Sequence, residues 1–172
     1  RQQEKLLLEV GLQGSKPVAT PGLRALKAQL EEEKPLDARQ HTLFRGCAAR
    51  GNYLAADRPD LLFAAKETCR TMANPTDLGI AALKRIGRYL SGKPRLVYRY
   101  DHQKASEVTV YTDTDWAGCP KTRRSTSGGA ILVGSHLIKT WSSTQPTVSL
   151  SSGEAEFYGL VKASGMGLGY QA

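Results

Sequence analysis

The stretch Glu107-Val-Thr-Val-Tyr-Thr-Asp-Thr-Asp115 alternates like a β-strand and ends in two acids. Its β-branched and aromatic residues favour a strand, whereas Asp disfavours one and costs free energy when it is buried without a partner. If the strand stays extended, Asp113 and Asp115 project from the same face and repel each other unless a cation lies between them. Alternatively, the strand ends at Thr112 and both acids belong to a turn.

The residues downstream predict two further strands and a helix. Residues 129–133 form an apolar run and residues 136–142 alternate again, with Gly134-Ser135 as the turn of a hairpin between them. A helix is expected from about Ser152. This second part of the chain is therefore expected to contain both strands and helix.

The expected helix carries two glutamates with different roles. Ser151-Ser-Gly-Glu154 has the spacing of a capping box, which gives Glu154 a structural task. Glu156 aligns with Leu160 and Ala163 at helical spacing, so it is expected to point toward the surface on which the helix packs. A carboxylate on a packing face needs a partner, and no cation lies nearby in the sequence.

Asp113 on a strand and Glu156 on a helix are residue types that could converge on Mg2+, which prefers oxygen ligands and keeps several waters. Two such ions about 4 Å apart can activate a water and neutralise a leaving oxygen in phosphodiester hydrolysis. Residue type and spacing alone leave this nuclease hypothesis open beside purely structural roles for both acids.

Upstream of residue 101 the pattern is helical. Helices are expected before Gly14, after Asp57 and from about residue 74 to 92. Asp57 is expected to be the N-cap of the second helix, with Pro59 in its first turn. The mixed-charge stretch 31–40 is expected to be a surface connection, and the polar segment 101–106 a domain boundary. The whole chain is thus expected to be a mixed α/β protein of the α+β kind.

The net charge of +8 is concentrated before this boundary. Residues 1–100 hold 18 Lys and Arg against 10 Asp and Glu, while residues 101–172 hold 6 of each. Such asymmetry hints at a nucleic-acid-facing segment. The candidates for phosphate contacts are Lys84, Arg85 and Arg88, with Lys93 and Arg95 beyond them, and Arg123 and Arg124 after the acidic strand. A solvated helix face or a polar turn would use the same residues.

The sequence gives little support for a disulfide framework, a zinc site or histidine catalysis. The three cysteines lack CxxC spacing, and the three histidines are scattered, so neither a disulfide framework, a zinc site nor histidine catalysis is indicated. No apolar run approaches the roughly 18 residues of a membrane span, and no signal-peptide pattern opens the sequence. We expect an intracellular protein without membrane segments.

Several motifs together resemble the Pol proteins of copia-type retrotransposons. The ribonuclease H part of that family is matched by Tyr111-Thr-Asp-Thr-Asp-Trp-Ala-Gly118, Thr122-Arg-Arg-Ser-Thr-Ser-Gly128, Ile138-Lys-Thr-Trp-Ser-Ser143, Gln145-Pro-Thr-Val148 and Leu150-Ser-Ser-Gly-Glu-Ala-Glu156. The end of its reverse transcriptase is matched by Lys16-Pro-Val-Ala-Thr-Pro21, Asp57-Arg-Pro-Asp60, Ala73-Asn-Pro75 and Leu83-Lys-Arg-Ile-Gly-Arg-Tyr-Leu90. The motifs run in the family's order and cover nearly the whole chain.

The resemblance implies two domains. Residues 1–100 would be the helical thumb and connection segment of a reverse transcriptase, without its paired-aspartate motif. Residues 106–172 would be a ribonuclease H-like fold, with a three-stranded antiparallel meander and a helix, truncated before its fourth strand. The implied setting is intracellular, in a cytoplasmic retrotransposon particle or in the nucleus.

The resemblance also implies a mechanism. The family hydrolyses the RNA strand of RNA/DNA hybrids with two Mg2+ ions; Asp113 and Glu156 match its catalytic metal ligands, and Asp115 a supporting position. The next ligand lies on the fourth strand, so the metal site is expected to be incomplete and the isolated fragment inactive. The expected partners are the RNA/DNA hybrid and the remainder of the Pol polyprotein.

The sequence is also compatible with two other functions. The chain could be a non-catalytic nucleic-acid-binding remnant of a decayed element. It could also be a structural or interaction module in which Asp113 and Glu156 make ordinary polar contacts.

Overall fold

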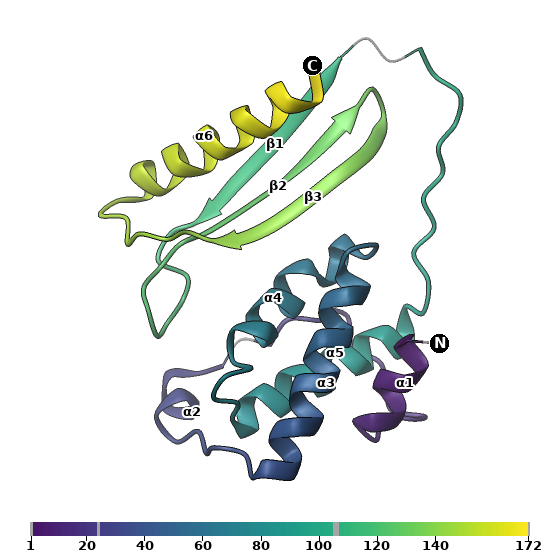
Figure 1. The fold of residues 1–172 in the computed structure, drawn as a ribbon, viewed down its shortest axis with the longest axis vertical. Helices are drawn as coiled ribbons and strands as arrows, with labels where there is room; N and C mark the ends of the chain where they lie inside the picture. Colours follow the sequence, from purple (N-terminus) through teal and green to yellow (C-terminus); the bar gives the residue numbers. More distant parts are fainter. Residues whose placement is uncertain (1, 24, 105–106, 172) are drawn as a thin grey trace. The chain divides into compact units, whose positions relative to one another are not determined.

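A computed structural model describes residues 2–23, 25–104 and 107–171. The chain divides into two compact units, Arg1–Val97 and Tyr98–Ala172 (Figure 1). The first is helical and the second combines strands with one long helix, so the molecule is a mixed α+β protein, as the sequence predicted. In the part of the chain that the structure describes, no helix is both long and apolar enough to cross a membrane.

The first unit is built from short and medium helices. They are α1 (Gln2–Glu9), α2 (Lys27–Glu31), α3 (Ala38–Ala55), the 3-10 turn η1 (Pro59–Leu61), α4 (Leu62–Arg70) and α5 (Asp77–Gly92). Their apolar faces share one core, whose largest fully buried side chains are Phe44, Leu6, Leu61, Leu83, Ile86 and Leu90. The helices expected before Gly14 and near residues 74–92 are therefore confirmed as α1 and α5.

Helix α3 lies partly in the stretch that was expected to be a surface connection. Asp37 caps its start, because the Asp37 carboxylate accepts a hydrogen bond from the backbone N–H of Gln40 at 2.8 Å. The connection therefore ends at Asp37 rather than at Gln40. The core residues that α3 contributes include Phe44 and Cys47.

The prediction that Asp57 caps a helix is wrong. The chain enters η1 at Arg58, whose side chain makes no capping bond, and α4 begins only at Leu62. Pro59 fixes the backbone of this tight first turn, and Arg58 is pulled inward to bind Asp60 instead. In this region Ala65 is buried, and Cys69 and Met72 pack against the core.

The second unit is a three-stranded antiparallel sheet covered on one face by a helix. Its strands are β1 (Val108–Asp115), β2 (Thr126–Val133) and β3 (His136–Thr144), in the order β1-β2-β3. Gly134, with φ +57°, makes the hairpin turn between β2 and β3, a backbone region that suits glycine. Helix α6 (Ser152–Gln171) follows, so the predicted strands, turn and helix are all present.

Small residues let α6 lie close to β1 (Figure 1). A Cβ added at Gly159 would stand 2.5 Å from Thr114 Oγ1, and one added at Gly167 would stand 2.8 Å from Val110 Cγ2. Gly159 lies over Thr114, near the end of β1, and the later residue Gly167 lies over the earlier residue Val110. The helix therefore runs antiparallel to the strand. Its first turns therefore lie at the C-terminal end of β1.

The segment just before β1 belongs to the second unit. Gln103 donates from Nε2 to the carbonyl of Val133 at 2.8 Å, and its Oε1 accepts from the backbone and side chain of Ser135. Tyr100 donates to the carbonyl of Leu137 at 3.0 Å. These bonds tie residues 100–103 to the β2–β3 hairpin. The polar segment expected to be the boundary, residues 101–106, includes Ala105 and Ser106, which lie outside the described residues.

Candidate functional site

Strand β1 continues through both acids of its sequence pattern. Asp113 pairs with Gly128 and Asp115 with Thr126 in the β1–β2 ladder, so neither acid belongs to a turn. Val110 and Thr114 face α6, and alternation along the strand puts Asp113 and Asp115 together on the opposite face. Both side chains are exposed. The shared face of the two acids is therefore as expected for an extended strand.

The start of α6 is held by the predicted cap. Ser151 Oγ accepts from the backbone N–H of Glu154 at 3.1 Å, and the Glu154 carboxylate accepts from the backbone N–H of Leu150 at 2.7 Å. Glu154 reaches one residue further back than in the simplest capping box, but it has the same function. Glu154 is thus committed to the helix end.

Glu156 does not lie on the packing face, contrary to the sequence-based expectation. The residues that α6 buries are Ala155, Gly159, Ala163 and Gly167, whereas Glu156 and Leu160 are exposed. The close approach of helix and strand selects the smallest side chains for this face. Glu156 is the residue directly after the buried Ala155, so it borders the helix–sheet contact and remains open to solvent.

Asp113 and Glu156 lie at the same end of the second unit, one at the end of β1 and one in the first turns of α6. Within residues 2–23, 25–104 and 107–171, neither carboxylate has a hydrogen-bond or ion-pair partner. The same residues contain no group of three or more His, Cys, Asp or Glu side chains close enough to hold a metal ion. The two carboxylates therefore lie on opposite faces of the sheet layer, so the convergence of Asp113 and Glu156 that the sequence suggested is not present in this structure.

The basic residues singled out in the sequence differ in their engagement. Lys84 is exposed on α5. Arg85 donates from Nη2 to Thr20 Oγ1 at 2.9 Å, and Arg88 donates from Nε to the carbonyl of Lys16 at 2.8 Å. Both arginines thus hold the extended segment 16–20 against α5. Their structural role leaves Lys84 as the freer cation of the three.

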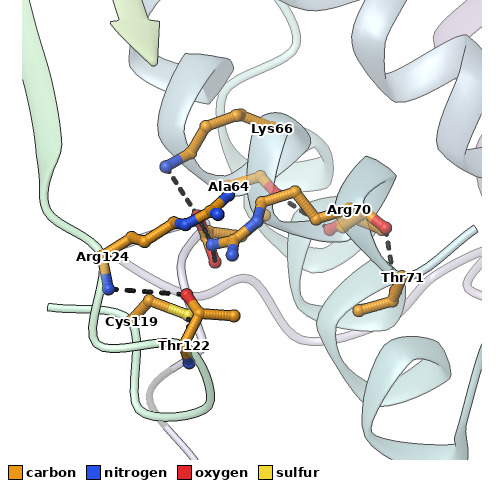
Figure 2. A network of polar contacts seen from close by, with 9 residues as sticks. Ala64, Lys66, Arg70, Thr71, Cys119, Thr122 and Arg124 are labelled. Atoms are coloured by element: carbon orange, nitrogen blue, oxygen red, sulfur yellow. Dashed lines mark hydrogen bonds and ion pairs between the residues drawn. The ribbon is translucent and has the colours of Figure 1, made fainter. Parts of the chain in front are cut away.

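Arg123 and Arg124 lie in the loop between β1 and β2 and are exposed. The loop is closed by two backbone bonds between Cys119 and the arginine pair, Arg123 N to Cys119 O at 2.8 Å and Cys119 N to Arg124 O at 3.2 Å. Figure 2 shows the Arg124 amide beside the hydroxyl of Thr122; the amide donates to this hydroxyl at 3.5 Å. Because the loop begins directly after Asp115 and ends at the start of β2, the backbone of both arginines lies at the same end of the sheet as the acids.

A buried polar cluster in the first unit was not anticipated from the sequence. Arg58, which is 8% exposed, donates to both oxygens of Asp60 at 3.0 and 2.7 Å and to the carbonyl of Lys93. Tyr89 donates its hydroxyl to Asp60 at 2.8 Å. Burial acts to raise the pKa of Asp60, but the bonds from Arg58 and Tyr89 outweigh it and lower this pKa below its ordinary value. Burial raises the pKa of Tyr89.

Cys47, Cys69 and Cys119 form no disulfide among the described residues. Cys47 is fully buried and donates from Sγ to Glu9. Burial, followed by the hydrogen bond to Glu9, raises the pKa of Cys47 to about 12. A thiol held protonated in this way is a poor nucleophile and a poor metal ligand.

Comparison with known proteins relates nearly the whole chain to transposon sequences, although no family model and no solved structure matches it. Its relatives include an uncharacterized mitochondrial protein of Arabidopsis thaliana, 35% identical over 91% of this chain and 64% of the relative. They also include the retrovirus-related Pol polyproteins from transposons RE2 and RE1 of the same plant, 35% and 34% identical over 92% of this chain. The chain spans 11% of the length of each polyprotein.

Proposed function

This chain belongs to the copia-type, retrovirus-related Pol polyproteins of transposons, and from that premise we propose that its second unit is the first part of a ribonuclease H. The proposed reaction is hydrolysis of the RNA strand of an RNA/DNA hybrid, with Mg2+ as cofactor. The first unit would be the end of the reverse transcriptase and its connection. Both would act within a larger polyprotein, in a cytoplasmic particle or in the nucleus.

The observation that carries this proposal is the exposed acidic end of β1, where Asp113 and Asp115 share one face. Asp113 and Glu156 come from different elements, both are exposed, and neither has a partner among the described residues. Glu154, by contrast, is committed to the cap of α6. A carboxylate without a partner in the fold has no evident structural role, and it is available to bind a ligand from outside the chain.

The donor set fits Mg2+ in kind, since carboxylate oxygens and water are its usual ligands. The resemblance assigns Asp113 and Glu156 as its ligands, with Asp115 in support. Because Asp113 and Glu156 lie on opposite faces of the sheet in this structure, sharing one ion would require the start of α6 to shift. A bound Mg2+ supplies a polarised water and charge neutralisation at the phosphate. Two carboxylates make a partial site, so we expect the isolated chain to be inactive and the full activity to need further ligands from the longer Pol polypeptide.

The chain's cations would hold the substrate. Arg123 and Arg124 are exposed in the loop that leaves the acidic end of β1, where they could contact phosphates of the hybrid. Lys84 on α5 offers a further phosphate contact, and Arg85 and Arg88 could add to it beside their bonds to residues 16–20. Such contacts are independent of sequence, as degradation along a hybrid requires.

Cleavage of a labelled RNA/DNA hybrid tests the proposal, in a longer Pol polypeptide that contains this sequence. Asp113→Asn and Glu156→Gln should each slow Mg2+-dependent cleavage at least ~100-fold, because Lewis-acid stabilisation of the transition state is worth several kcal/mol. Glu107→Gln is the matched control: it removes an exposed carboxylate just before the opposite end of β1 and should leave the rate unchanged. Equal cleavage by Asp113→Asn would remove Asp113 from the mechanism.

The alternative, a non-catalytic nucleic-acid-binding remnant, is favoured by one observation. Residues 1–97 hold 17 Lys and Arg against 10 Asp and Glu, whereas residues 98–172 hold 7 against 6. Hybrid binding that persists in every variant, without Mg2+-dependent cleavage by the wild-type polypeptide, would establish this alternative.

A further inference from the structure

We propose that the segment before β1 binds single-stranded nucleic acid, with the rings of Tyr98 and Tyr100 stacking on unpaired bases and neighbouring cations contacting phosphates. This binding site uses neither Asp113 nor Glu156. It is therefore independent of the proposed metal site and of cleavage.

The segment is an exposed, basic connection. Residues 93–104 lie between α5 and β1, in no helix or strand (Figure 1), and residues 93–102 are all exposed. Residues 93–104 hold four Lys and Arg but only one acid, Asp101. A nucleic-acid strand requires both kinds of group that this segment contains, because cations attract its phosphates and aromatic rings stack on its bases.

Three aromatic rings contact one another in succession beside the β2–β3 hairpin. The centroids of the Tyr98 and Tyr100 rings lie 6.2 Å apart, with a tilt of 31° between the rings. The Tyr100 ring meets the ring of His136 edge to face, at 5.0 Å between centroids. Tyr98 is 37% exposed and Tyr100 is 57% exposed. The second unit therefore presents two neighbouring tyrosine rings to solvent.

The Tyr100 ring is fixed without being covered. Its hydroxyl donates to the carbonyl of Leu137 at 3.0 Å, and Gln103 ties the same segment to Val133 and Ser135. A side chain that is already held in one position loses little further conformational entropy when a ligand stacks on it. These bonds thus make Tyr100 a preformed stacking surface.

The charges beside the tyrosines favour a polyanion over a protein surface as the partner. Arg99, His102 and Lys104 are exposed. Arg99 donates from Nε to Asp101 at 2.8 Å, but the two side chains of this pair are 85% and 68% exposed. Since an exposed ion pair contributes little to stability, a phosphate can compete with Asp101 for the guanidinium group.

The bases that stack on these rings must be unpaired. In a duplex or an RNA/DNA hybrid the bases are stacked on one another inside the helix, so their faces are accessible only at its ends. Stacking on an aromatic ring is tolerant of sequence, because every base has a flat face. The ligand class is therefore a single strand of DNA or RNA of any sequence.

Fluorescence anisotropy of a short labelled oligothymidylate, titrated with the 172-residue chain, tests this proposal. Tyr98→Leu and Tyr100→Leu should each weaken binding about 10-fold, because each removes one base–aromatic stack and keeps an apolar side chain. Tyr100→Phe keeps the ring and should retain most of the affinity. Tyr53→Leu is the matched control, since it removes an exposed tyrosine from α3 and should leave the affinity unchanged.

Two further ligands separate stacking from attraction between charges. An abasic strand of the same length keeps the phosphates and has no bases, so the wild type should bind it at least about 10-fold more weakly than the oligothymidylate. A duplex of the same length should bind equally to the wild type and to both Leu variants. In 1H–13C spectra of the wild type, the ring protons of Tyr98 and Tyr100 should shift upfield with the oligothymidylate and not with the abasic strand.

Four outcomes would overturn the single-strand site. They are oligothymidylate affinity in both Leu variants equal to that of the wild type, equal binding of the abasic and complete strands, an equal loss in Tyr53→Leu, and an equal loss in Tyr100→Phe and Tyr100→Leu. Weaker duplex binding by the Leu variants, in the same proportion, would instead make the segment a contact for paired nucleic acid. If Tyr100→Leu does not fold, Tyr98→Leu and the ring-proton shifts decide. None of these results bears on cleavage.

Discussion

At the scale of single residues, burial decides which charged groups serve the fold and which remain free. Asp60 lies in the first unit between Arg58 and Tyr89 and is fully engaged, whereas Asp113 is exposed and unengaged. A carboxylate thus stabilises the fold in the first unit, whereas in the second unit a carboxylate remains available to bind a ligand. Sequence position alone does not separate these two cases.

Asp60 should give the first unit a dependence on acid. Its folded pKa lies below the ordinary value of ~3.9, so its contribution is complete above about pH 4 and is lost as pH falls through the folded pKa. Asp60→Asn should cost about 2 kcal/mol at pH 7, the scale of hydrogen bonds to charged groups. It should also reduce the loss of stability below pH 4.

Hydrogen exchange of the buried α5 amides, measured between pH 3 and 7, checks this prediction. Tyr89→Phe is the milder companion variant, since it removes one bond to Asp60 and keeps the ring; it should cost about 1 kcal/mol. An Asp60→Asn protein with the wild-type acid dependence would show that another carboxylate controls it.

At the scale of elements, α6 depends on glycine where it crosses β1 and not elsewhere. Gly159→Ala would place a methyl group 2.5 Å from Thr114 Oγ1, so the Thr114 side chain, the helix or the strand must shift. We expect a loss of about 1–3 kcal/mol, the usual cost of overpacking. Gly165→Ala, in open space on the same helix, should instead gain up to ~1 kcal/mol. Urea denaturation of both variants measures the difference.

The prediction is specific because the two alanine substitutions should change the stability in opposite directions. Helix propensity by itself would make both alanines stabilising. A Gly159→Ala variant at least as stable as the wild type would therefore mean that α6 does not approach β1 as closely as the structure describes.

The sequence predicted elements well where a local rule governs them. Strands β1 and β3 follow the period-2 pattern, β2 contains the predicted apolar run, Gly134 sets the β2–β3 turn, and Ser151 with Glu154 sets the start of α6. Helix α3 escaped prediction because the residues it buries beside Phe44 are small, among them Gly51 and Ala55, and give a weak apolar stripe. Its true start signal, the cap at Asp37, lay within a stretch of mixed charge.

The prediction that Glu156 lies on the packing face of α6 was wrong for a related reason. A hydrophobic pattern assigns the large residue Leu160 to the packing face, but close approach to β1 selects Ala155 and Gly159 instead. Leu160 is 54% exposed as a result. The hydrogen bonds from the buried Gln145 side chain to Ser127 and Ala155 were also beyond the sequence, since these residues lie 18 and 10 positions away in the chain.

At the scale of the whole molecule, the charge asymmetry predicts where hybrid binding depends on salt. Residues 1–97 carry a net +7 and residues 98–172 a net +1. Each phosphate contact contributes about −0.9 to the slope of log affinity against log salt concentration on a duplex. Lys84→Gln should therefore weaken hybrid binding and make the slope shallower by about 0.9, if Lys84 contacts one phosphate.

Fluorescence anisotropy of a labelled hybrid, titrated at several salt concentrations, measures this slope. Arg45→Gln is the matched control, since it removes one exposed charge from α3 in the same unit and should leave the slope unchanged. An equal change in both variants would mean that overall charge, rather than a contact at Lys84, governs binding. No change in either would place the phosphate contacts elsewhere, with Arg123 and Arg124 as the next pair to neutralise.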